Sequence, residues 1–177
     1  MEKQTKRNEI YKGKVISVVC DDVVLDDGRK TKREIVLHNG GVCIALKDVT
    51  DNKYYMVKQY RYAQGKDMLE FCAGKIEKGE EPDPAVLREC QEELGYKAKN
   101  VKKFGCITPT CGYSSEKIYL YYGEKDEKVG QDLDVDESID VYKYSFAEIK
   151  EMIKNGLIDD AKTIALILHI EMDGINA

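Results

Sequence analysis

Short runs of alternating or β-branched apolar residues dominate the first sixty positions of the chain. Such runs are typical of strands, in which successive side chains point to opposite faces. Between two of the runs, Asp27-Gly28 predicts a tight hairpin turn, because glycine accepts the positive φ that such turns require. We therefore expect an antiparallel arrangement, with strands over residues 14–20, 22–26, 33–38, 41–47 and 53–60.

The second half of the chain mixes strand and helix patterns. Ser145 and Glu148 have the spacing of a capping box, and Gly156 is suited to end the helix that they begin. The segment 161–172 is apolar on most sides, which predicts a helix packed in a core or an interface. Further strands are expected over residues 102–108, 117–123 and 139–144, with an acidic loop over 131–138 before the last of them.

One more helix is predicted in the middle of the chain, within an acidic segment. Asp83 and Pro84 suit the N-cap and the first helical position, and Gly95 suits the position after the last turn. At 3.6 residues per turn, one side of this helix is apolar and carries Val86, Leu87, Cys90 and Leu94. The opposite side is acidic and carries Glu89, Glu92 and Glu93.

The acidic side of this helix has two interpretations. Glu89 and Glu93 are like charges at i and i+4, which costs roughly 0.2–0.5 kcal/mol in an isolated helix, and only Arg88 offers local compensation. A divalent cation such as Mg²⁺ would convert this repulsion into coordination, because it takes oxygen ligands. A plain solvated face is the alternative, and the charge pattern alone leaves both open.

Composition and charge narrow the class of protein. The 177 residues are 42% hydrophobic and 34% charged, which fits one globular domain with room for a small subdomain. No run approaches the ~20 apolar residues of a membrane span, and the N-terminus lacks a secretory pattern, so a cytoplasmic protein without membrane contact is expected. The net charge of -5 argues against nucleic acid as a partner. Residues 6–14 are interpreted as a solvated arm.

The cysteines and histidines are interpreted as structural. The six cysteines contain no C-x-x-C pair, which favours buried free thiols over disulfides or a zinc site. His38 and His169 lie in apolar strand and helix contexts. The cysteines occupy positions 20, 43, 72, 90, 106 and 111.

The spacing of the acidic segment carries a family resemblance. It reads Gly74, five residues, Glu80, seven residues, then "RECQEELGY" over residues 88–96. This resembles the Nudix box, G-x5-E-x7-R-E-U-x-E-E-x-G-U with U a bulky apolar residue, and all seven fixed positions match. The departures are Cys90 and Tyr96, which occupy the two apolar positions and can still fill core space.

The resemblance extends over most of the chain and is strongest to the ADP-ribose pyrophosphatase branch, including the Q-Y-R step that ends at Arg61. It implies an α/β fold, an α/β/α sandwich around a mixed sheet, in residues 41–177. Residues 1–40 would form a small N-terminal antiparallel β subdomain that builds a homodimer. Cys72 and Cys111 stand where the branch usually has prolines, and the chain has no Trp for stacking on adenine.

The resemblance also implies roles for individual residues. Arg61 would hold a substrate phosphate, a role suited to a planar guanidinium, with an ordinary surface arginine as the alternative. Glu70 would contact the nucleoside. Arg88 would be structural, pairing with a box glutamate to fix the loop on the helix, and Glu80 would do likewise. Mg²⁺, or Mn²⁺, would be held by Glu89 and Glu93, with help from Glu92 and the carbonyl of Ala73.

The implied activity is Mg²⁺-dependent hydrolysis of ADP-ribose, or a close nucleoside diphosphate sugar, to AMP and ribose 5-phosphate or its equivalent. The catalytic base would be an acidic residue of the loop after the box, among Asp134, Asp136 and Glu137, with Glu116 as the other candidate. One alternative is a Nudix hydrolase for another nucleotide sugar or a dinucleotide. The other is a sensor that binds ADP-ribose without cutting it, against which the three intact box glutamates count.

Overall fold

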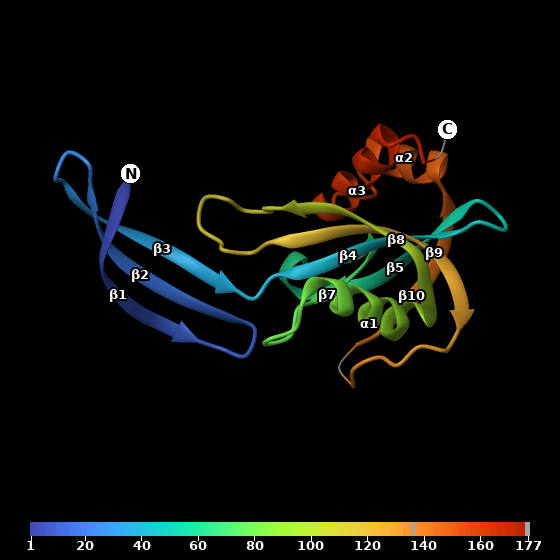
Figure 1. Ribbon diagram of the computed structural model, residues 1–177, viewed down its shortest axis with the longest axis horizontal. Coiled ribbons are helices and arrows are strands. Elements are labelled where there is room, and N and C mark those ends of the chain that lie inside the picture. Colours follow the sequence, from blue (N-terminus) through green and yellow to red (C-terminus); the bar gives the residue numbers. More distant parts are fainter. Residues whose placement is uncertain (136, 176–177) are drawn as a thin grey trace. The chain divides into compact units, whose positions relative to one another are not determined.

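The chain folds into two compact units, which Figure 1 shows in sequence colours. The computed structural model describes residues 1–135 and 137–175. The first unit contains residues 1–40 together with residues 108–117, and the second contains the remainder. The contribution of residues 108–117 to the first unit was not expected from the sequence.

The first unit is a three-stranded antiparallel sheet in the order β1-β2-β3, built from Glu2–Lys12, Ile16–Leu25 and Lys30–His38. The predicted turn at Asp27-Gly28 joins β2 to β3, and Gly28 has a φ of 84°. The segment 108–117 is attached to β3, because Val36 N donates to Tyr113 O at 2.8 Å and Ser115 N donates to Val36 O at 2.9 Å.

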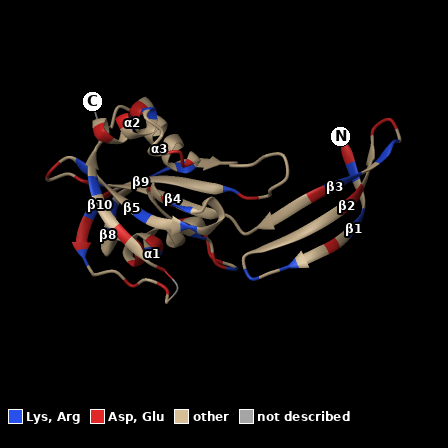
Figure 2. Cartoon of the chain, turned by 180° about the vertical axis from the view of Figure 1, so that it is seen from behind, with Lys and Arg blue, Asp and Glu red and all other residues tan. Residues whose placement is uncertain are grey.

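Two expectations for this unit are wrong. Residues 6–14 are not a solvated arm, because most of them belong to β1, which pairs along its length with β2. The predicted strands 14–20 and 22–26 are one strand, since Asp21 is buried within β2 and is neutralised there by Arg7, at 3.0 and 2.8 Å. The buried positions of β2 still alternate, as Val19, Asp21 and Val23, and an ion pair takes the place of an apolar side chain at Asp21. Figure 2 shows basic and acidic residues interspersed along these strands.

The second unit is built on a mixed sheet with the strand order β10-β5-β4-β9-β8, to which β6 and β7 are added beside β5 and β4. The pairing of β4 with β9 is parallel, and the other pairings are antiparallel. The strands are β4 (Gly41–Asp48), β5 (Lys53–Arg61), β6 (Lys66–Glu70), β7 (Cys72–Lys75), β8 (Tyr96–Ile107), β9 (Ile118–Lys128) and β10 (Ile139–Ser145), and a 3₁₀ turn spans Tyr62–Gln64.

Helices cover both faces of this sheet. One apolar core lies between the sheet and α1 (Pro82–Leu94), and the other lies between the sheet and the helices α2 (Phe146–Lys154) and α3 (Ala161–Met172). Strand β4 is buried at every position, as a central strand with both faces covered must be. The predicted α/β/α sandwich with a small antiparallel sheet is confirmed.

The helix predictions are largely confirmed, with two corrections at α1. Ser145 and Glu148 form the expected capping box of α2, and Gly95 ends α1 with a φ of 75°. However, α1 begins at Pro82, so Asp83 lies inside its first turn and bonds to Lys103 and to the Tyr121 hydroxyl instead of capping the helix. Leu87 was expected on the apolar side, but it is 38% exposed.

All six cysteines are free thiols. Cys43, Cys72 and Cys90 are buried as expected, whereas Cys106 and Cys111 are exposed, because their segments lie at the edges of the units rather than in a core. Among the described residues, no helix combines the length and the apolar character that crossing a membrane would need.

Candidate active site

The loop between β7 and α1 is held on the helix by Arg88. Its guanidinium bonds to Glu80 at 3.0 and 3.1 Å and donates to the Lys75 carbonyl at 3.1 Å. Glu80 in turn accepts a hydrogen bond from the amide of Glu77 at 2.9 Å. The pairing of Arg88 with Glu80 that the resemblance implied is therefore present, and it orders the loop before the helix.

Two glutamates of α1 turn inward toward β7. Glu93 is 3% exposed and accepts a hydrogen bond from the amide of Ala73 at 3.1 Å. Glu89 lies against Gly74, where an added β-carbon would come within 1.9 Å of its carboxyl carbon. Both predicted metal ligands thus face the Ala73-Gly74 step.

Burial and mutual repulsion weaken the acidity of these two carboxyl groups. Burial raises the pKa of Glu89 to about 7; Arg88 opposes the rise, and Glu92 and Glu137 add to it. Burial likewise raises the pKa of Glu93 to about 7, with contributions from Glu89 and Glu137. A charge that is unfavourable in this position is one that a cation would stabilise.

The carboxylates of Glu89 and Glu93 fit a divalent cation that takes its remaining ligands from water and substrate. Within the parts of the chain that the structure describes, no three His, Cys, Asp or Glu side chains converge into a complete metal site. Arg88 Nη1 donates to both Glu92, at 2.7 Å, and Glu89, at 3.0 Å. Mg²⁺ is usually held by one or two carboxylates together with water and substrate phosphates, so the two inward glutamates suffice as the protein's share.

The acidic loop after β9 is attached to the C-terminal end of α1. Asp132 N donates to Glu92 O at 3.0 Å, and the Gln131 side chain donates to Glu93 O at 2.6 Å. Glu137 is exposed, and its charge acts on both Glu89 and Glu93. The attachment therefore brings one predicted base close to the inward glutamates.

The other predicted bases have different surroundings. Asp136 lies outside the described residues. Asp134 is exposed, and its carbonyl accepts from Glu137 N at 2.9 Å. Glu116 belongs to the first unit, where its carboxylate lies 3.6 Å from Nδ1 of His38. Of these candidates, Glu137 is the one whose charge is among the main causes of the raised pKa of both Glu89 and Glu93.

The predicted substrate residues Arg61 and Glu70 bind each other. Arg61 holds Glu70 through two hydrogen bonds of 2.7 Å each, and Lys162 also donates to this carboxylate. Burial alone would raise the pKa of Glu70, which is 1% exposed, but Arg61 and Lys162 hold it below its ordinary value. The Glu93 charge contributes to the raised pKa of Arg61, so this cluster is linked electrostatically to the inward glutamates.

A cavity of about 390 Å³ opens beside the Arg61 cluster, with Lys162 and Asp160 among its lining residues. The sequence reasoning missed these two residues. The sequence did contain a signal for Lys162. A lysine in the first turn of a helix is unfavourable next to the positive end of the helix dipole, which suggests that it has a role elsewhere.

Comparison with known proteins decides the family. The model of the NUDIX domain matches residues 37–167. The chain belongs to the Nudix family. The Nudix helix is thus α1, and the residues of the box have the local geometry described above.

Several relatives and one solved structure resemble the chain over nearly its whole length. An ADP-ribose pyrophosphatase of Bacillus subtilis (strain 168) is 35% identical over 97% of this chain and 93% of its own, and a methanol dehydrogenase activator of Bacillus methanolicus has the same values. A GDP-mannose pyrophosphatase of Cronobacter sakazakii is 27% identical over 94% of this chain and 96% of its own. The crystal structure of an ADP compounds hydrolase matches with a TM-score of 0.83 and 15% identity, over 98% of this chain and 96% of that one.

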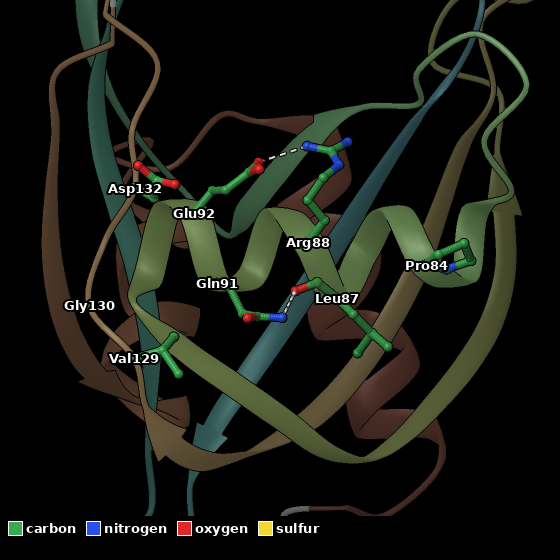
Figure 3. Close-up of a pocket in the computed structure, with 8 residues that line it drawn as sticks. All are labelled: Pro84, Leu87, Arg88, Gln91, Glu92, Val129, Gly130 and Asp132. Carbon is green, nitrogen blue, oxygen red and sulfur yellow. Dashed lines mark hydrogen bonds and ion pairs between the residues drawn. The ribbon is translucent and has the colours of Figure 1, made fainter.

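A second cavity, of about 520 Å³, lies on the outer side of the Nudix helix. Figure 3 shows Arg88 and Glu92 joined on one side of the helix, with Leu87, Gln91 and Val129 on its other side; all five line the cavity. The exposure of Leu87 is explained by this cavity, because the loop that carries Val129 only partly covers the helix.

Proposed function

We propose that this protein hydrolyses the pyrophosphate bond of ADP-ribose, giving AMP and ribose 5-phosphate. The observation that carries the proposal is the arrangement of two glutamates, the buried Glu93 and the partly buried Glu89, which face the Ala73-Gly74 step. The similarity to the Bacillus subtilis ADP-ribose pyrophosphatase, over nearly the full length of both chains, supports ADP-ribose as the substrate.

The proposed cofactor is Mg²⁺, with Mn²⁺ as a substitute. Glu89 and Glu93 would hold it, with Glu92 and the carbonyl of Ala73 helping. When bound, the ion neutralises pyrophosphate oxygens and makes water a better nucleophile, which are the two requirements for breaking this bond.

The remaining tasks fall to side chains of the second unit. Arg61 is proposed to bind a phosphate, because a guanidinium that already holds Glu70 through Nε and Nη2 has its Nη1 directed elsewhere, without a partner among the described residues. Glu137 is proposed to accept a proton from the attacking water, since it is exposed and close to the inward glutamates. Asp136 and Glu116 are the alternatives for this role. The contact of Glu70 with the nucleoside stays a prediction, and both oxygens of Glu70 are already bonded to Arg61 and Lys162.

The substrate is tested with a panel of nucleoside diphosphate compounds incubated with Mg²⁺, with products separated by chromatography. ADP-ribose, GDP-mannose and a dinucleotide are the informative members, because relatives of this chain include a GDP-mannose pyrophosphatase. ADP-ribose should give the highest kcat/KM. Preference for GDP-mannose would identify a different nucleotide sugar as the substrate, and binding of ADP-ribose without release of AMP would favour the sensor.

We further propose a homodimer in the cytoplasm. In the first unit, Ile10 and Tyr11 of β1 and Val15 of the turn before β2 are exposed, and a contiguous apolar patch of such residues would suit an interface between two copies. The six free thiols fit a reducing compartment, in which disulfides are rare.

A further inference from the structure

Lys162 is a buried lysine next to the proposed phosphate-binding arginine. It is 9% exposed, and its amine donates to Glu70 and, at 2.9 Å, to Asp160. Lysine is almost never buried to this extent without a paired acid. Its burial is therefore tied to the carboxylate that it shares with Arg61.

The position of Lys162 in its helix gives no reason for a cation. It is the second residue of α3, whose first turn presents unpaired amides and the positive end of the helix dipole. Asp160 satisfies that end, accepting from Thr163 N at 3.0 Å and from Thr163 Oγ1 at 2.6 Å. A helix start of this kind favours acidic residues, so a lysine here costs helix stability and must be explained by its other contacts.

Those contacts place two cations on one buried carboxylate. Glu70 Oε2 accepts from both Arg61 Nη2 and Lys162 Nζ, and Oε1 accepts from Arg61 Nε. Without Lys162, the negative charge of Glu70 would be matched by Arg61 alone. Asp160 accepts from Thr163 through Oδ2 and from Lys162 through Oδ1, so the four side chains are neutral together, and without Lys162 they would carry one net negative charge.

We propose that Lys162 is a positioning residue that takes up the charge of Glu70, so that Arg61 stays available to a diphosphate bound in the adjoining 390 Å³ cavity. This inference rests on the proposed function of Arg61. Arg61 gains from Glu70 a fixed orientation through two hydrogen bonds, and Lys162 prevents that same contact from cancelling the positive charge of the guanidinium. The ligand class is a diphosphate, whose negative oxygens respond to a change of one unit charge nearby.

The test compares Lys162→Met, which keeps the aliphatic stem, with Lys162→Arg, which keeps the charge. Binding of methylenediphosphonate, a non-hydrolysable diphosphate, is measured by calorimetry with Mg²⁺ in the full chain, beside KM and kcat for ADP-ribose. Lys162→Met should raise both Kd and KM by about 10-fold while kcat changes by less than about 3-fold, because a charge acts on the bound anion throughout the reaction. Lys162→Arg should restore most of the affinity.

The route through Glu70 is tested by repeating Lys162→Met in a Glu70→Gln background. There the neutral amide no longer cancels Arg61, so the loss of Lys162 should raise Kd by less than about 3-fold. An equal 10-fold loss in both backgrounds would mean that Lys162 acts on the ligand independently of Glu70, by direct contact or by its own charge, and would overturn the proposal. A lowered melting temperature with unchanged Kd and KM would also overturn it, because it would make Lys162 purely structural.

The two proposals can fail separately. Suppose that the wild-type protein hydrolyses no nucleoside diphosphate but binds methylenediphosphonate, and that this binding depends on Lys162. That result would refute the hydrolase and support the role of Lys162. Hydrolysis of ADP-ribose with a normal KM in Lys162→Met would do the reverse. Wild-type protein that neither binds nor hydrolyses would overturn both.

Discussion

The carboxylate of Glu89 packs against the α-carbon of Gly74, and this contact sets how closely the Nudix helix approaches β7. A β-carbon at position 74 would lie 1.9 Å from Cδ of Glu89 and about as close to both of its oxygens, at 2.0 and 2.1 Å. Real β-carbons do not approach other atoms so closely. Glycine at position 74 is therefore required by the position of a proposed metal ligand.

Gly74→Ala should displace Glu89 and lower kcat by about 10²-fold, since a misplacement of about 1 Å in a catalytic group costs that much. The measurement is kcat for ADP-ribose with saturating Mg²⁺. Gly112→Ala is the matched control, because a β-carbon at position 112 meets nothing within 4 Å. Equal activity of the two variants would show that Glu89 does not need its present position.

Glu93→Gln should keep the fold and lose most turnover. The amide has nearly the shape of the carboxylate but lacks the charge that would hold the cation, so the rise in melting temperature caused by Mg²⁺ should also shrink. Glu81→Gln is a suitable control, because Glu81 is the exposed N-cap residue of the same helix and its side chain makes no cap bond. A folded Glu93→Gln protein with wild-type kcat would remove Glu93 from the site.

Asp48 is expected to make stability depend on pH. Burial alone would raise the pKa of this carboxyl group, which is 2% exposed, but hydrogen bonds from Lys125, Thr50 and Lys143 hold it well below its ordinary value. A lowered pKa stabilises the fold above the unfolded-state pKa of about 4, and this stabilisation is lost as the pH falls below it.

Asp48→Asn should therefore cost about 2 kcal/mol at pH 7, less than for a fully buried pair because the lysines are partly exposed. At pH 3 the difference between the two proteins should be smaller by about 1 kcal/mol. Urea denaturation at the two pH values measures both numbers. A difference that does not change with pH would mean that Asp48 acts through packing alone.

How well each element could be predicted from the sequence depends on whether its signal is local. The capping box at Ser145 and the glycine at position 95 were predicted correctly, because caps are decided by a few neighbouring residues. Strand β1 was missed since its pairing depends on Arg7 reaching Asp21 in another strand. Strands β6 and β7 were missed because they are short and add to neighbouring strands rather than alternating clearly.

In the candidate site, too, the features with a local signal were predicted and those that depend on distant contacts were not. The box spacing predicted which glutamates belong together, because i and i+4 positions share a helix face. It did not predict that Lys162 would join Arg61 and Glu70 from a helix 92 residues further along the chain than Glu70. Contacts between segments that are distant in the sequence can be predicted only when the three-dimensional arrangement is known, and a single sequence does not give that arrangement.

The first unit should mediate dimerisation. Wild-type protein at micromolar concentration is expected to sediment as a dimer, and Ile10→Glu should weaken this dimer by placing a charge among exposed apolar side chains. Lys3→Glu, a charge change at another exposed position of the same strand, should leave sedimentation unchanged. A monomeric wild type would contradict the proposal.

The last prediction concerns the catalytic base. Glu137→Gln should lower kcat by roughly 10²- to 10⁴-fold, the usual contribution of general acid–base catalysis, and leave KM nearly unchanged. A base acts chiefly in the transition state, whereas Arg61 and the metal ligands also hold the substrate in its ground state. Loss of Arg61 should therefore raise KM, and this difference separates the two roles.

Asp136→Asn and Glu116→Gln are the parallel variants, with kcat and KM measured under the same conditions. Glu137 is favoured because its charge already acts on Glu89 and Glu93, and because Gln131 and Asp132 attach its loop to the Nudix helix. If only Glu116→Gln abolishes turnover, the base belongs to the first unit and the assignment to the acidic loop is wrong. If each of the three variants keeps wild-type kcat, none of these carboxylates is the base, and the proton must be accepted elsewhere.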